Sequence, residues 1–420
     1  MLNSEIEASL KLLKINSKKQ RQLSTSIKNA VLLSLSEKLK FQEPGLLAAN
    51  EIDLKKLPQT AAPAFRDRLT LNSARLADIR ESLRQVAALE DPVGEIIEEN
   101  RLVNGLRTQR VRSPLGIIFM IFESRPNVIL EAFSLAFKSG NSIILRGGSD
   151  SSMTANCIYQ IMAQTLDEHG LTDTAFYGLK NYDHAVVEDL LKRKDLIDIV
   201  IPRGGEKLIE YVQRTALMPI IKNDRGLCHT YVDEDADLVM AKNIVINAKT
   251  QRPGVCNSLE TVLVHQKIAV RFITDLYEAT ESFQLIWYGD QQTLKILHQK
   301  QRVHPATDKN WDTEYLDLII NCRVVESLAQ ALQHIEKHSS KHSEAIVTSS
   351  EQKAHLFQSE VDAAVVFWNA STRFTDGYQL GLGGELGIST QKLHVRGPVG
   401  LRELTTARWI ISGTGQIRGS

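Results

Sequence analysis

Residues 142–148 read SIILRGG, a short apolar run that ends in two glycines. β-Branched residues favour an extended strand, and the glycines permit a tight turn before the next element. Met153 to His169 then has the length and pattern of a helix. The order of strand, glycine-rich turn and helix is typical of a parallel sheet, so this stretch predicts the α/β class.

The same order of elements recurs further along the chain. A largely apolar strand is expected from Asp198 to Ile201, followed by a turn that contains Gly204 and Gly205 and by a helix that begins at Glu206. Backbone amides at such a turn and helix start favour phosphate oxygens. The turns lack the spacing of G-x-G-x-x-G, so they leave open both a nucleotide site and an ordinary tight turn.

Hydrophobic periodicity predicts the remaining elements. Residues 1 to about 90 have a helical pattern, and further helices are expected at 129–138 and 327–337. An alternating run at 103–111 with charged positions predicts an exposed ribbon. Strands are expected at 115–122, 142–145, 261–265, 318–325, 345–348, 361–367 and 404–411.

Composition excludes several classes of protein. The 420 residues suggest two or three domains, and 43% hydrophobic with 24% charged residues is typical of a globular protein. Lys plus Arg and Asp plus Glu both number 50, so no net charge indicates binding to nucleic acid or to an acidic membrane. We find no signal peptide or membrane span, and the four cysteines show no paired spacing. We therefore expect a cytoplasmic protein.

One cysteine lies in a distinctive loop. Residues 247–260 read NAKTQRPGVCNSLE, and Cys256 follows the Pro253–Gly254 turn. A thiol is nucleophilic as the thiolate, which nearby cations favour, and Lys249 and Arg252 are within one loop's reach. The loop alone is equally compatible with catalysis and with a small buried side chain.

Two further sets of polar residues are candidates for a functional site. His334, His338 and His342 are spaced to share a helical face, but no H-E-x-x-H motif accompanies them, so the prediction is a solvated helix end without metal. The glycine-rich segment from Asn369 to Thr390 predicts a binding wall. Arg373 lies in this segment, and Lys392 and Arg396 follow it. Each of these basic residues could bind a substrate carboxylate or phosphate.

Six motifs together resemble one enzyme family. They are SRPN at 124–127, ILRGG at 144–148, IPRGG at 201–205, AKTQRPGVCN at 248–257, NASTRFTDG at 369–377 and STQKLHVRGPVGL at 389–401. In order, spacing and total length they resemble the gamma-glutamyl phosphate reductases of the aldehyde dehydrogenase superfamily. The resemblance implies an α/β fold with a Rossmann-like cofactor domain, an α/β catalytic domain and a small β oligomerisation flap.

The resemblance also implies domain limits. The cofactor domain is expected at residues 1–100 and 115–235, and the catalytic domain with Cys256 at residues 236–365. The oligomerisation flap and C-terminal segment are expected at residues 101–114 and 385–420.

The family's reaction is the reduction of L-glutamyl 5-phosphate by NADPH to L-glutamate 5-semialdehyde, the second step of proline synthesis. Cys256 would attack the acyl phosphate to form a thioester, and Asn127 lies where the superfamily places an oxyanion donor. The resemblance implies cofactor contacts from Arg146, Gly204, Gly205 and Glu314. For the substrate carboxylate we expect Arg125 or Arg373.

The resemblance bears on partners too. It implies a homo-oligomer and leaves open a complex with glutamate 5-kinase, while no nucleic acid, membrane or metal is expected.

One stretch departs from the family pattern. Relatives often carry a glycine pair where this chain has Asn223-Asp224-Arg225, which leaves the shape of that loop open. The stretch also lacks the glutamate base of hydrolytic aldehyde dehydrogenases, offering only Asp224. A reductase of acyl phosphates needs no deacylating water, so this absence favours reduction.

Three alternative functions compete with that of a reductase. The first is an NAD-dependent aldehyde oxidiser, which the missing glutamate disfavours. The second is a thiol hydrolase that uses Cys256 with Gln251 and a distant histidine, but the chain lacks the local signatures of cysteine proteases. The third is an inactive binding protein, against which the intact Cys256 and Asn127 argue.

Overall fold

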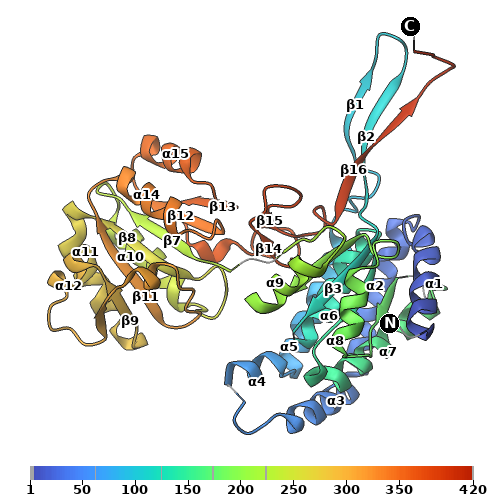
Figure 1. Ribbon diagram of the computed structural model, residues 1–420, viewed down its shortest axis with the longest axis horizontal. Coiled ribbons are helices and arrows are strands. Elements are labelled where there is room, and N and C mark those ends of the chain that lie inside the picture. Colours follow the sequence, from blue (N-terminus) through green and yellow to red (C-terminus); the bar gives the residue numbers. More distant parts are fainter. Residues whose placement is uncertain (1–3, 62, 124, 173–174, 223–224, 419–420) are drawn as a thin grey trace. The chain divides into compact units, whose positions relative to one another are not determined.

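The computed structural model describes residues 4–61, 63–123, 125–172, 175–222 and 225–418 (Figure 1). The chain forms two compact units. Unit 1 comprises Met1–Asn223, Gly381–Gly387 and Val399–Ser420, and unit 2 comprises Asp224–Leu380 and Ile388–Pro398. Each unit has its own parallel sheet, so the α/β class is confirmed.

Unit 1 begins with helices, as the sequence predicts. Local caps start two of them: the Ser24 hydroxyl accepts from the amide of Ile27, and the Asn72 side chain accepts from that of Arg75. The helices are α1 (Ser4–Gln20), α2 (Thr25–Phe41), α3 (Glu43–Lys56), α4 (Pro63–Leu69) and α5 (Ser73–Ala88). No helix in the part of the chain that the structure describes combines the length and apolarity that a bilayer span requires.

The parallel sheet of unit 1 has the strand order β5-β4-β3-β6. Its strands are β3 (Ile117–Phe122), β4 (Ser142–Arg146), β5 (Phe176–Gly178) and β6 (Ile199–Arg203). The connecting helices are α6 (Pro126–Lys138), α7 (Ser152–Glu168) after the 3₁₀ turn Ser149–Ser151, α8 (His184–Leu191) and α9 (Glu206–Thr215). From β3 the chain goes to β4 and β5 on one side and then to β6 on the other. The switch point of the sheet therefore lies between β3 and β6.

A separate antiparallel sheet projects from unit 1 (Figure 1). It consists of β1 (Ile96–Arg101), β2 (Arg107–Pro114) and β16 (Thr405–Ser412), with β2 in the middle. The predicted C-terminal strand is confirmed, but the strand predicted at 103–111 begins too early. Residues 102–106 form the turn between β1 and β2, where Gly105 adopts φ +87°.

Unit 2 is built on a seven-stranded parallel sheet with the order β10-β9-β11-β8-β7-β12-β13. Its strands are β7 (Cys228–Val232), β8 (Leu259–His265), β9 (Ile286–Gly289), β10 (Val303–Pro305), β11 (Ile319–Val325), β12 (Ser343–Val347) and β13 (Val365–Trp368). The strand predicted at 361–367 is shorter, because Val361 is the C-cap of the preceding helix. Two short strands, β14 (Ile388–Ser389) and β15 (Gly397–Pro398), pair separately.

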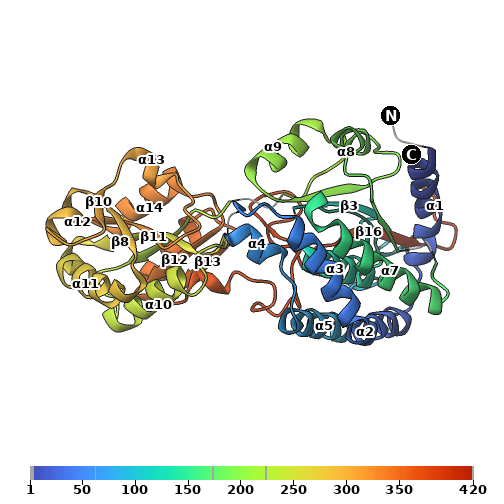
Figure 2. The same cartoon turned by 90° about the horizontal axis from the view of Figure 1, so that it is seen from below.

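Helices cover both faces of this sheet (Figure 2). The helices are α10 (Leu238–Thr250), α11 (Gln266–Ala279), α12 (Gln291–Ile296), α13 (Asp308–Trp311), α14 (Leu328–His338) and α15 (Glu351–Glu360), with 3₁₀ turns at Glu281–Phe283 and Thr372–Phe374. Along β8, Val262 and Val264 pack with α10 and α11, whereas Leu263 packs with α14 and α15. This alternation buries the strand on both sides, as expected of a central parallel strand.

Candidate active site

Cys256 lies in the loop that connects α10 to β8 in unit 2, here called the cysteine loop (residues 251–258). α10 is capped by Asp237, whose carboxylate accepts hydrogen bonds from two backbone amides of the first turn. The helix ends at Thr250, and Pro253 lies three residues beyond it. The half-buried Cys256 is thereby held at the amino end of β8.

The neighbouring strand fixes the backbone of Cys256. The Cys228 thiol donates a hydrogen bond to the Cys256 carbonyl oxygen over 3.3 Å. A Cβ atom at Gly226 would lie 1.5 Å from the same oxygen, so only glycine permits this approach. The Gly226 amide donates to Oε1 of Glu314 over 2.8 Å. Cys256 and Glu314, two of the predicted site residues, therefore both contact the short segment from Gly226 to Cys228.

The loop after β13 is bonded to the cysteine loop through Asn257. Thr372 Oγ1 donates to the Asn257 carbonyl over 2.8 Å, and the Asn257 side-chain amide donates to the Thr375 carbonyl over 2.8 Å. Arg373 donates from Nε to Gln251 over 2.9 Å and from Nη1 to Asn257 Oδ1. These bonds orient the Arg373 guanidinium beside the cysteine loop.

Arg373 also interacts electrostatically with Cys256. Burial is the largest cause lowering the pKa of Arg373, followed by the charge of Arg252, while Asp376 and Cys256 act in the opposite direction. A guanidinium remains charged in proteins. Its charge therefore favours the thiolate form of Cys256, which is the nucleophilic form.

A buried ion pair lies at the base of the cysteine loop. Lys249 Nζ is 3.0 Å from Glu260 Oε2, and each side chain is 1% exposed. Burial raises the pKa of Glu260 to about 7, although Lys249 opposes the shift. Burial likewise lowers the pKa of Lys249. The sequence suggested Lys249 as a cation that acts on Cys256, but the Lys249 ammonium group is engaged by Glu260.

The three histidines at 334, 338 and 342 are buried, so the prediction of a solvated helix end is wrong. Arg323 lies 2.8 Å from Nδ1 of His334, and Nδ1 of His338 lies 2.8 Å from the Asp312 carboxylate. Such partners allow imidazole groups to be buried. Among the described residues, no group of three or more His, Cys, Asp or Glu side chains could hold a metal ion.

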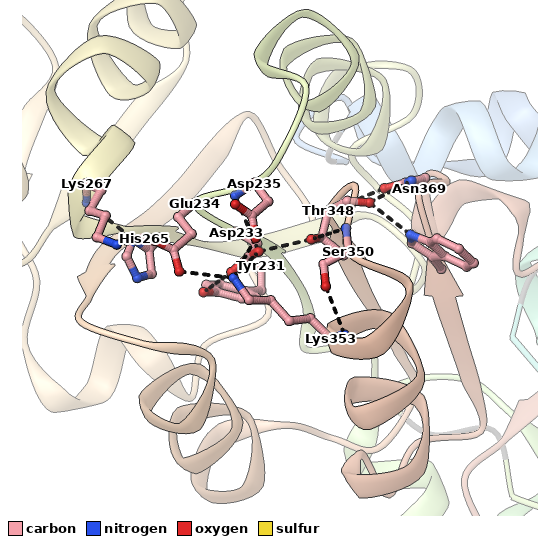
Figure 3. Close-up of polar contacts among 11 residues, drawn as sticks. Tyr231, Asp233, Glu234, Asp235, His265, Lys267, Thr348, Ser350, Lys353 and Asn369 are labelled. Atoms are coloured by element: carbon pink, nitrogen blue, oxygen red, sulfur yellow. Dashed lines mark hydrogen bonds and ion pairs between the residues drawn. The ribbon is translucent and has the colours of Figure 1, made fainter.

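A second polar cluster occupies the opposite, carboxyl-terminal edge of the unit 2 sheet (Figure 3). Lys353 Nζ lies within 3.0 Å of carboxylate oxygens of Asp233, Glu234 and Asp235. Asp233, which is 1% exposed, also accepts from the hydroxyls of Tyr231 and Thr348. The cluster borders a hollow of about 360 Å³, but its charges satisfy one another, so we assign it a structural role.

The other predicted site residues lie in unit 1, at the carboxyl ends of its strands. Arg146 ends β4 and donates to the Tyr182 carbonyl over 3.0 Å. Its Nε is buried, and no described residue accepts from it. Gly204 and Gly205 follow β6 and lead into α9. Ligands of α/β sheets bind beside the switch point, so the glycine turn lies where a dinucleotide is expected.

Asn127 and Arg125 lie at the start of α6, directly after β3. The Asn127 side chain donates to Oε1 of Glu131 over 2.8 Å, one helical turn further along. Burial is the largest cause lowering the pKa of Arg125, followed by the charge of Arg203. The structure therefore brings Arg125 and Asn127 to the same sheet edge as the glycine turn.

One residue of this edge was not predicted from the sequence. Glu123 accepts the hydrogen bond of the Gly205 amide over 2.7 Å. The available signal was a carboxylate directly after a buried apolar strand. Ser124, Asn223 and Asp224 lie outside the described residues. The loop in which relatives carry a glycine pair therefore falls partly on residues that the structure does not describe.

Comparison with known proteins defines the class first. The sequence model of the aldehyde dehydrogenase family matches residues 68–299, more than half of the chain. An engineered glycolyl-CoA reductase with bound NADP⁺ shares the fold, with a TM-score of 0.70 at 14% identity and 96% coverage of each chain. The chain is thus an aldehyde dehydrogenase-type protein by its sequence family and by its fold.

More similar relatives narrow the assignment. The gamma-glutamyl phosphate reductase of Moorella thermoacetica is 47% identical over 397 residues, which are 94% of each chain. The crystal structure of the Thermotoga maritima gamma-glutamyl phosphate reductase matches with a TM-score of 0.95 at 42% identity, covering 99% of this chain and all of that one. The chain belongs to the gamma-glutamyl phosphate reductase family.

Proposed function

We propose that this protein reduces L-glutamyl 5-phosphate to L-glutamate 5-semialdehyde and phosphate through a thioester on Cys256, the second step of proline biosynthesis. The observation that supports it most directly is the construction of the cysteine loop. The close approach of Gly226 and the hydrogen bonds from Cys228 and Thr372 fix its backbone, and the charge of Arg373 favours the thiolate. Such rigid placement is what nucleophilic catalysis requires.

The first half of the reaction is an acyl transfer. The Cys256 thiolate attacks the acyl carbon, a carbon–sulfur bond forms, and the bond to phosphate breaks. The tetrahedral species carries an oxyanion, for which we assign the Cys256 backbone amide and the Asn127 side chain as donors. Asn127 donates to Glu131 in the present structure, so this role requires it to exchange acceptors.

The second half requires a nicotinamide cofactor, which supplies hydride to the thioester carbon. The chain fits such a cofactor at the carboxyl edge of the unit 1 sheet. The Gly204–Gly205 turn opens helix α9 at the switch point, and the buried Arg146 Nε has no described acceptor. We assign these residues to the dinucleotide and Glu314 to its nicotinamide ribose, with NADPH as the physiological form.

Two arginines are proposed for the substrate. Arg373 has two of its donors engaged by Gln251 and Asn257, and a guanidinium carries five. The remaining donors could hold the glutamyl carboxylate bidentately. Arg125 is the second candidate, from the edge of unit 1. Replacement of either residue by alanine is expected to raise the Michaelis constant for the semialdehyde.

The decisive experiment runs the reaction backwards, because the acyl phosphate is unstable. Purified protein would receive NADP⁺ and glutamate 5-semialdehyde, with and without inorganic phosphate. We expect NADPH to form only with phosphate, and Cys256→Ala to abolish its formation. Cys157→Ala is the matched control, since Cys157 is also a partly exposed thiol and lies on α7. Activity that is indifferent to phosphate would indicate a hydrolytic aldehyde dehydrogenase instead.

We also propose the assembly that the family resemblance implies. The projecting sheet of β1, β2 and β16 exposes apolar side chains, including Trp409 and Ile411, at 54% and 60%. We assign it to contacts between copies of the chain in a cytoplasmic homo-oligomer. Deletion of residues 405–418 should lower the mass measured by light scattering. An unstable product of glutamate 5-kinase would benefit from direct transfer, and co-sedimentation of the two enzymes would test such a complex.

A further inference from the structure

Glu123 occupies the position in unit 1 where a phosphate group is expected. Its carboxylate accepts the hydrogen bond of the Gly205 amide over 2.7 Å. Gly205 precedes α9 and has no side chain that could cap the helix. The cap comes instead from a residue 82 positions earlier, at the end of a different strand. Because this cap is a side chain from another strand, the Glu123 carboxylate can move away from Gly205 while the backbone of α9 stays in place.

The backbone holds Glu123 against the glycine turn. Its amide donates to the Arg203 carbonyl over 3.2 Å, so the pairing of β3 with β6 reaches this residue. A Cβ atom at Gly204 would lie 2.8 Å from Glu123 Oε1. The carboxylate therefore fills the space that the missing side chain of residue 204 leaves above the turn.

A carboxylate and a phosphate compete for this place. The first amides of a helix carry partial positive charge, and either anion can satisfy them. Both anions cannot occupy hydrogen-bonding distance of one amide, because their charges repel each other at such a short separation. A phosphate that binds the Gly205 amide must therefore displace Glu123.

Arg125, two residues after Glu123 in the sequence, is the cation to which the displaced carboxylate would turn. Burial is the largest cause lowering the pKa of Arg125, and the charge of Glu123 opposes this shift, so the two groups interact electrostatically. Arg125 is half-buried, and no carboxylate in the described part of the chain forms an ion pair with its guanidinium. Movement of Glu123 from the Gly205 amide toward Arg125 would exchange one favourable contact for another.

We propose that Glu123 is a latch on the dinucleotide site, a role that rests on the proposed use of a nicotinamide cofactor. In the free protein its carboxylate occupies the amide that a cofactor phosphate requires, and it must leave before the phosphate binds. Glu123 thus lowers the affinity of the site for the dinucleotide and for other phosphate-containing anions.

The test compares dinucleotide binding by variants of the full-length protein. Calorimetric titration with NADP⁺ and NADPH would be made on wild type, Glu123→Gln and Glu123→Ala. Glutamine keeps the size and an acceptor oxygen for the cap but loses the charge. Both variants lack the charged acceptor that competes with phosphate for the Gly205 amide. We expect them to bind the dinucleotides about tenfold more tightly, because a hydrogen bond to a charged group is strong enough to change affinity by about this factor.

A matched control removes a different acid from the same helix. Glu210→Gln neutralises a carboxylate on α9 that pairs with Arg214 and does not contact the glycine turn. This variant should bind dinucleotides like wild type. Thermal unfolding of every variant would confirm that α9 remains folded. The chemical shift of the Gly205 amide should differ between wild type and Glu123→Gln before any ligand is added.

The possible outcomes separate the latch from the cofactor assignment. Unchanged or weaker dinucleotide binding by Glu123→Gln and Glu123→Ala would overturn the latch. If wild type and variants bind neither dinucleotide, the cofactor assignment fails. Titration with inorganic pyrophosphate then decides the latch alone: tighter binding by Glu123→Gln supports it, and equal binding refutes it.

Discussion

The carbonyl oxygen of Cys256 lies where a side chain at Gly226 would begin. The gap that separates this oxygen from an ideal Cβ position is 1.5 Å, far below any contact distance. Gly226 is also held by Glu314 through its amide. The position of the nucleophile therefore depends on the absence of a side chain 30 residues earlier in the sequence.

Replacement of Gly226 by alanine should displace the cysteine loop. A misplacement of about 1 Å can cost about 100-fold in rate, so we expect kcat to fall by at least that factor. The measurement is the phosphate-dependent oxidation of glutamate 5-semialdehyde under saturating substrates. Overpacking should also lower the unfolding free energy by about 1–3 kcal/mol.

Gly254→Ala is the control for this change, because Gly254 is a glycine of the cysteine loop itself. A Cβ atom there would meet only the Leu316 carbonyl at 3.7 Å, which is ordinary contact. Its activity should stay within a few-fold of wild type. Equal activity of both alanine variants would show that the Gly226 approach is not required.

Arg373→Gln should make Cys256 less reactive. The substitution removes the cation that interacts with the thiol and the two hydrogen bonds that orient it. A smaller thiolate fraction should slow alkylation by iodoacetamide at pH 7 by about threefold to tenfold. Arg408→Gln, on strand β16 of unit 1, serves as control and should alkylate at the wild-type rate. An unchanged rate in Arg373→Gln would leave only the substrate-binding role for this residue.

The sequence was sufficient for the more apolar parallel strands and for the location of the cysteine loop, but it did not predict β5, β7, β9 and β10. Apolar runs such as 115–122 and 318–325 predict buried strands because only buried strands are apolar on both faces. The ribbon was misplaced at its turn, since alternation continues through Val103 and Gly105 although the chain reverses there. Alternation reports extended backbone and does not show where hydrogen bonding stops.

The contacts that define the site could not be predicted in the same way. Glu314 bonds an amide 88 residues away, and Glu123 caps a helix 82 residues away. Neither pair leaves a local pattern, because both depend on which strands lie side by side. The buried histidines were misjudged for the same reason: the Arg323 contact of His334 comes from a strand, not from its own helix.

Lys353→Met should destabilise unit 2 (Figure 3). Burial raises the pKa of Asp233, but hydrogen bonds led by that from Lys353 outweigh it and lower the pKa overall. Asp233 is 1% exposed, so loss of the ammonium group leaves a buried carboxylate without its cation. Removal of one partner of a buried ion pair costs about 3–5 kcal/mol of unfolding free energy. Because Lys353 is 28% exposed, we expect a loss at the lower end of this range. Urea denaturation measures this change.

Lys267→Met provides the comparison for the Lys353 variant. Lys267 pairs with Glu234 of the same cluster but is 69% exposed. Pairs in this environment contribute at most about 1 kcal/mol, so the variant should unfold close to wild type. If both methionine variants lost the same stability, burial of Asp233 would not be the cause.

Glu260 should make the stability of the protein depend on pH. Burial raises its pKa from 4.5 to about 7, so between these values the folded protein holds a proton that the unfolded chain has released. The unfolding free energy should therefore fall as the pH rises from about 4.5 to about 7 and then level off. Between pH 5 and pH 8 the expected loss is about 2–3 kcal/mol.

Glu260→Gln removes this titration, so its unfolding free energy should lack that part of the decline. Urea denaturation of wild type and variant at pH 5 and pH 8 measures the contribution of the Lys249–Glu260 pair, since burial lowers the pKa of Lys249 and Glu260 opposes that shift. Glu278→Gln is the control, since Glu278 is 59% exposed and lies 3.9 Å from Lys300. It should reproduce the wild-type pH dependence. An identical decline in Glu260→Gln would mean that the buried Lys249–Glu260 pair stays ionised throughout this range.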